Sequence, residues 1–186
     1  MLPMLPAAAG CQMSTRSTAS QPVATTAPAQ GLDAPAYVAD IEAVVVPPAG
    51  WQAEAIKESS RHAHQVWLSP SGRTAYGVIH FSLPFPVGHD LALWGFMREM
   101  RRSEGEAALL EKRWDPNLRA LRFVAQGGMY TVRTNLHLRG FSGWAVYAGT
   151  LTTDPVQSDE LDLAEQAREH TLVGGRRTRA GDQPAN

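Results

Sequence analysis

Residues 118–151 read LRALRFVAQGGMYTVRTNLHLRGFSGWAVYAGTL, three largely apolar runs separated by two glycine-containing turns. In the first run, Leu121 and Phe123 alternate with Arg122, which is the period of a strand with one buried face. Turns as short as Gly127-Gly128 join antiparallel neighbours. The stretch therefore predicts a β-meander with strands over 118–126, 129–138 and 144–151.

Further strands are expected upstream of this meander. Residues 63–68 and 74–81 are rich in apolar and β-branched side chains, and Ser69-Pro70-Ser71-Gly72 supplies the turn of a hairpin between them. Shorter strands are expected over 41–46 and 51–58. The run 107–114 fits a helix or a strand, and we favour a strand because Gly105 separates it from the preceding helix.

Two helices complete the pattern. The first begins at Asp90, a predicted N-cap, and ends at Gly105; its apolar stripe is Leu93, Phe96, Met97 and Met100. The second begins near Ser158 and ends at Gly174; its apolar side is Leu163, Ala164, Ala167 and Thr171. This order predicts an α+β fold, a twisted and mostly antiparallel sheet of about six to eight strands covered by two main helices.

The segment Val44-Val45-Val46-Pro47-Pro48-Ala49-Gly50-Trp51 is a strand running into a proline- and glycine-containing turn. Together with the meander and the closing helix, it resembles the PsbP-like fold, which is named for an extrinsic protein of photosystem II and is shared by DcrB-type bacterial lipoproteins. The resemblance spans roughly residues 40–173. It implies an accessory or assembly role, usually without catalysis, and it supplies no catalytic motif to place on this chain.

The single cysteine, Cys11, follows Ala9-Gly10 and resembles the lipobox of bacterial lipoproteins, in which the thiol is lipidated. Ala8 departs from the pattern, since Leu is usual there, and the apolar leader has no basic residue. Either the true start lies upstream, or the match is a chance feature of a cytosolic N-terminus. The first reading predicts a lipid anchor on Cys11, on the periplasmic side of the bacterial cell envelope.

The composition divides the chain into four parts. Residues 1–11 form the partial signal and lipobox leader, 12–36 a disordered tether, 37–174 a single α+β domain, and 175–186 a disordered polar tail. A tether of this Ser/Thr/Ala/Pro-rich composition has a reach of about 25–30 Å.

Charge and hydropathy limit the function classes. The chain has 17 basic and 18 acidic residues, so its overall charge gives no reason to expect nucleic-acid binding. No apolar run approaches the roughly 18–20 residues of a spanning helix, so membrane contact is expected through the anchor. Phosphate-binding glycine loops, Cys-x-x-Cys pairs and EF-hand loops are absent from the sequence.

Histidines are the best candidates for chemistry. His62 and His64 lie two residues apart and would share a face of a strand. If the hairpin centres near Ser71, His80 falls opposite His62, and the three imidazoles could bind zinc or copper with His137 or a carboxylate as a fourth ligand. The alternative is that these are polar residues on an exposed face of the sheet.

These observations favour a membrane-tethered envelope lipoprotein with a non-catalytic binding or assembly-accessory domain, an unidentified protein partner and no cofactor. The sequence identifies no catalytic residue. One alternative is a small metal-binding protein or metal-dependent enzyme that uses His62, His64 and His80. Another is a cytosolic interaction domain.

Overall fold

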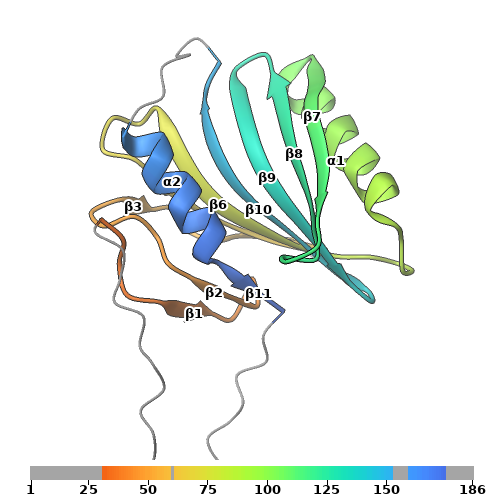
Figure 1. Ribbon diagram of the computed structural model, residues 1–186, viewed down its shortest axis with the longest axis horizontal. Coiled ribbons are helices and arrows are strands. Elements are labelled where there is room, and N and C mark those ends of the chain that lie inside the picture. Colours follow the sequence, from red (N-terminus) through yellow and green to blue (C-terminus); the bar gives the residue numbers. More distant parts are fainter. Residues whose placement is uncertain (1–30, 60, 153–158, 175–186) are drawn as a thin grey trace, which may run out of the picture.

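The structure, a computed structural model, describes residues 31–59, 61–152 and 159–174. Cys11, residues 12–30 of the expected tether and the tail 175–186 lie outside the described residues. The chain builds a large sheet, a small sheet and two helices (Figure 1). The strands of the large sheet are β3 (Gln52–Ala53), β4 (Lys57–Glu58), β5 (His62–Leu68), β6 (Thr74–Ser82), β7 (Ala107–Asp115), β8 (Ala120–Gly127), β9 (Tyr130–Arg139) and β10 (Ser142–Leu151).

The large sheet has eight antiparallel strands in the order β3-β5-β6-β10-β9-β8-β7, and β4 also pairs with β5. The predicted meander is confirmed as β8, β9 and β10, and the run after Gly105 is the strand β7. The segment 51–58, expected as one strand, forms two pieces of two residues each, β3 and β4, which pair with different parts of β5.

A small sheet of three strands packs beneath helix α2 (Asp159–His170), in the order β1-β2-β11 (Figure 1). Its strands are β1 (Ala36–Val38), β2 (Ala43–Val45) and β11 (Leu172–Val173). Strand β2 was expected, whereas β1 and β11 were not. The folded domain also begins earlier than predicted, because Leu32 is buried and bridges Pro48. An apolar side chain with an available core site overrides the polar composition around it.

The two helices cover opposite faces of the large sheet. Helix α1 (His89–Glu104) buries Leu93, Met97 and Met100 against one face, as its stripe predicted. Helix α2 and the small sheet pack on the other face, where α2 buries Leu161, Ala164, Ala167 and Arg168. Each face therefore has its own apolar cluster, with Ala145 on the α1 side and Val146 on the α2 side of β10.

The start of α1 differs from the prediction. Asp90 is not the N-cap: the helix begins at His89 after Gly88, which provides no side-chain cap. Asp90 lies in the first turn, where the helix dipole favours an acid, and its carboxylate accepts a hydrogen bond of 2.8 Å from Lys112 of β7. Neither described helix is long and apolar enough to cross a membrane.

Candidate functional site

The structure does not bring together the three histidines expected to share a metal. His62 and His64 lie on one face of β5, but in the ladder with β6 the partner of His80 is Ala63. The predicted register was wrong by one residue, because the hairpin loop has four residues, 70–73, closed by a hydrogen bond from Ser69 N to Thr74 O. A shift of one residue reverses the face, so His80 projects to the other side of the sheet.

The imidazole rings of His64 and His80 have different environments. His64 Nε2 lies 2.7 Å from the Tyr147 hydroxyl, and burial, followed by the charges of Lys57 and His62, lowers the pKa of His64 to about 4. On the other face, His80 stacks on Trp144 with ring centroids 5.0 Å apart.

His137, the expected fourth ligand, is the partner of Trp144 in the ladder between β9 and β10. It is therefore on the face of His80, one strand beyond Trp144, and away from His62 and His64. Within residues 31–59, 61–152 and 159–174, no group of three His, Cys, Asp or Glu side chains is arranged to hold a metal ion.

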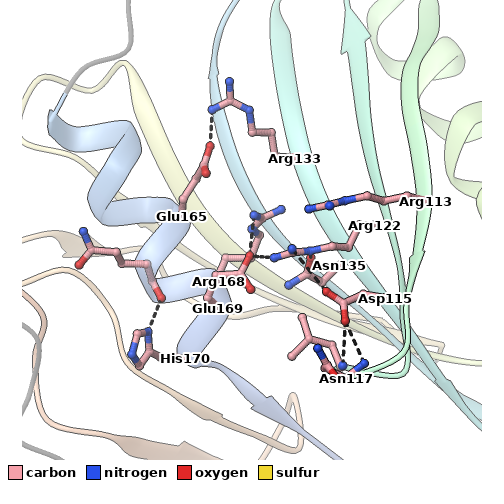
Figure 2. A network of polar contacts seen from close by, with 12 residues as sticks. Arg113, Asp115, Asn117, Arg122, Arg133, Asn135, Glu165, Arg168, Glu169 and His170 are labelled. Atoms are coloured by element: carbon pink, nitrogen blue, oxygen red, sulfur yellow. Dashed lines mark hydrogen bonds and ion pairs between the residues drawn. The ribbon is translucent and has the colours of Figure 1, made fainter.

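A different set of charged side chains lies between α2 and the outer strands of the large sheet (Figure 2). In the ladders, Arg122 of β8 pairs with Arg113 of β7 and with Asn135 of β9. Asn135 in turn pairs with Val146, which is on the α2 side of the sheet. These side chains therefore share that face. Helix α2 contributes three charged residues at helical spacing: Glu165, Arg168 and Glu169.

Together these residues enclose a cleft of about 260 Å³, which we call the arginine cleft. Its lining residues are Glu111, Arg113, Arg122, Phe123, Val124, Arg133, Glu165 and Arg168. Six of these eight residues are charged, whereas pockets for apolar ligands are lined mostly by hydrophobic side chains. The lining therefore suits a small charged group.

Ion pairs hold part of this cluster in place. Arg122 donates from Nε to Asn135 Oδ1 at 3.2 Å, lies 3.4 Å from Asp115 and pairs with Glu169. Glu169 also accepts a hydrogen bond of 2.8 Å from Arg168.

About one turn nearer the start of α2, Glu165 pairs with Arg133 of β9 (Figure 2). The helix is thus attached to β8 and β9 through two carboxylates of its own. Of the four arginines that line the cleft, Arg113 has the weakest ion pair. Its Nε is 3.9 Å from Glu111, and both side chains are about three-fifths exposed.

Arg168 is the most confined charge of the cleft. Its side chain is 9% exposed, and its Nε atom is buried without a hydrogen-bond partner among the described residues. Burial, and then the positive charges of Arg122, Arg133 and Arg113, lower the pKa of Arg168 to about 10, while Glu165 opposes the shift. Glu169, at 2.8 Å, and Glu165 offset part of this repulsion, but within the described residues they leave the buried Nε of Arg168 without an acceptor.

The arginine cleft was missed at the level of sequence. The alternation of β8 places Arg122 on the face opposite Phe123, and that face was expected to be solvent-exposed. The signal that could have found the cleft is the charged spacing Glu165, Arg168, Glu169 on α2, beside the apolar positions Ala164 and Ala167. Such a helix can pack its apolar side on apolar strands of a sheet and pair its charged residues with charged side chains of the neighbouring strands.

A scan against protein-family models found no match, and neither did a search of curated proteins. Among solved structures, the chain is similar to the solution structure of cyanobacterial PsbP (CyanoP) from Synechocystis sp. PCC 6803, with a TM-score of 0.56 and 13% sequence identity. The match covers 80% of this chain and 95% of that one. At this identity the likeness shows the fold: the domain is α+β and PsbP-like.

Proposed function

We propose that this chain is a non-catalytic binding or assembly-accessory domain, tethered by a lipid on Cys11 to a bacterial membrane and exposed on the periplasmic side. The arginine cleft carries the binding part of the proposal. It gathers four guanidinium groups at the flank of α2, and one of them, Arg168, is buried with an unpaired Nε. A protein partner would approach this side of the domain, and the near-neutral net charge of −1 argues against nucleic acid as that partner.

Two further observations support the tethered accessory role. The fold is that of cyanobacterial PsbP, and Cys11 is followed by a polar segment rich in Ser, Thr, Ala and Pro before the first described residue, Gly31. A segment of that composition would let a folded domain move about 20–30 Å from its anchor.

The tether is tested by fractionating cells that express the full chain as wild type or Cys11→Ser. We expect the wild type in the membrane fraction and carrying a metabolically incorporated fatty acid, and Cys11→Ser in the soluble fraction without it. Equal distribution of the two forms, or equal labelling, would refute the anchor.

The binding role is tested by isolating tagged chain from mildly solubilised membranes of the organism that encodes it. Wild type should retain a specific partner that is lost in an Arg113→Gln, Arg133→Gln double variant, and retained when the exposed Arg102 of α1, on the opposite face, is changed to Gln. Identical partners in all three preparations would contradict a role for the cleft.

A further inference from the structure

We propose that the arginine cleft between α2 and strands β7–β9 binds a small dianion of the phosphate class, either free in solution or as a lipid headgroup. This deepens the proposed function by naming the chemistry that the binding surface recognises. It can be tested on purified protein, without the anchor or a partner.

The dimensions of the cleft favour a small ligand. Its volume of about 260 Å³ is at the lower limit of typical small-molecule pockets, which span about 300–1,000 Å³. A phosphate group, alone or with a short substituent, fits such a space, whereas a nucleotide-sized cofactor would extend far beyond it.

The charges of the lining favour an anion. Four arginines and two glutamates line the cleft, and two further carboxylates, Asp115 and Glu169, pair with Arg122 and Arg168 beside it. Within the described residues, Arg113 and the Nε of Arg168 are the donors that these carboxylates satisfy least. Guanidinium groups bind phosphate with pairs of parallel N–H···O bonds, and they do so better than lysine. A metal cation would have to compete with four guanidinium groups for the carboxylates of the cluster.

The internal ion pairs do not account for the whole cluster. They account for the charges of Arg122 and Arg133, whose partners Glu169 and Glu165 attach α2 to the sheet. Among the residues that the structure describes, they leave the Nε of Arg168 buried and unpaired, and Arg113 has only Glu111, at 3.9 Å, as an ion-pair partner. In Figure 2, the Arg113 guanidinium extends toward Arg122 and Arg168. An anion among these three groups would provide acceptors for Arg113 and would compensate the positive charge of the buried Arg168.

The test is a titration of the full chain with inorganic phosphate at constant ionic strength, with chloride as the balancing ion, followed by amide and arginine Nε chemical shifts. We expect saturable shifts in α2 and β7–β9, and none in α1. Arg113→Gln should weaken binding about tenfold, the loss expected for one charge-assisted pair. Glu111→Gln, which removes a repelling carboxylate from the lining, should strengthen it several-fold.

Arg102→Gln on α1 is the matched control and should leave the affinity within twofold of wild type. A second titration uses phosphatidylcholine vesicles with and without phosphatidic acid. If the acidic vesicles bind and free phosphate displaces them, the ligand is a headgroup; if only free phosphate binds, it is a soluble phosphate.

The proposal is overturned if neither source gives saturable shifts, or if Arg113→Gln binds as tightly as wild type. If phosphate binds but the wild type and the Arg113→Gln, Arg133→Gln variant isolate the same proteins, only the accessory role is refuted, so the two failures are distinguishable.

Discussion

At the scale of single residues, the Tyr147 side chain restricts position 77 to glycine and contacts His64. Gly77 of β6 lies opposite Tyr147 of β10, and the tyrosine ring occupies the space above the glycine. A methyl group on Gly77 would be 2.5 Å from the ring atom Cζ and from the hydroxyl oxygen. The hydroxyl in turn contacts His64 of β5, the strand on the other side of β6.

Gly77→Ala should therefore destabilise the domain by about 1–3 kcal/mol, because Tyr147 must move and its contact with His64 is lost. Urea unfolding measures the change. Gly95→Ala in the middle of α1 is the matched control: nothing lies within 4 Å of the added methyl, and alanine should stabilise the helix by about 0.5–1 kcal/mol. Equal effects of the two substitutions would contradict the close contact at Gly77.

Two buried histidines predict a loss of stability in mild acid. Burial is the main cause that lowers the pKa of both His64 and His137 from 6.5 to about 4, so between these pH values the unfolded chain binds protons that the folded chain does not. Stability is therefore full above about pH 6.5 and falls as the pH approaches 4, by at most about 3 kcal/mol for each ring.

The slope of the unfolding free energy between pH 6.5 and 4 measures this effect. His64→Gln should reduce the slope. If removing His64 does not alter the slope, its imidazole is not buried in its neutral form.

At the scale of elements, helix α2 joins an apolar half of the sheet to a charged half. Leu161, Ala164 and Ala167 pack on β6 and β10, whereas Glu165 and Glu169 pair with arginines of β9 and β8. The position of α2 across the sheet is thus determined by packing on one side and by charge on the other.

Glu169→Gln should destabilise the domain by about 1–3 kcal/mol, because it leaves Arg122 and the buried Arg168 without their shared carboxylate. Glu111→Gln, at an exposed side chain 3.9 Å from its partner, should change stability by less than about 0.5 kcal/mol. Thermal unfolding at low salt compares the two variants. A loss at Glu111 as large as that at Glu169 would show that the cleft charges act collectively rather than through these pairs.

The elements themselves were largely predictable, since local periodicity is sufficient to identify long strands and helices. Alternation at Leu121 and Phe123 and the stripe from Leu93 to Met100 indicated the meander and α1 correctly. Strands β1 and β11 were missed because strands of two or three residues are too short to show a periodic pattern. In addition, β11 pairs with β2, a strand far from it in the sequence.

The candidate site could not be predicted because it depends on register and on packing between distant elements. The histidine hypothesis depended on the centre of one hairpin, and one residue of error moved His80 to the other face. The arginine cleft is lined by residues of β7, β8, β9 and α2. These residues are far apart in the sequence, so no short sequence motif identifies them.

At the scale of the whole molecule, the two faces of the sheet carry different tasks. The α1 side is covered by the apolar stripe of α1, while the α2 side combines a core shared with the small sheet and the arginine cleft at its border. A domain with a preformed anion-binding site on one face can bind a ligand without changing its fold, so ligand binding should appear as added stability.

The most direct test of the cleft as a ligand site is the unfolding free energy of the full chain as a function of phosphate concentration at constant ionic strength. A ligand present at about ten times its Kd stabilises the folded state by about 1.4 kcal/mol. In the wild type we predict a gain of that size at ten times the Kd, which continues to grow with the logarithm of the phosphate concentration, and a markedly smaller gain in Arg113→Gln. An equal gain in both proteins, or none beyond that produced by chloride, would contradict the account.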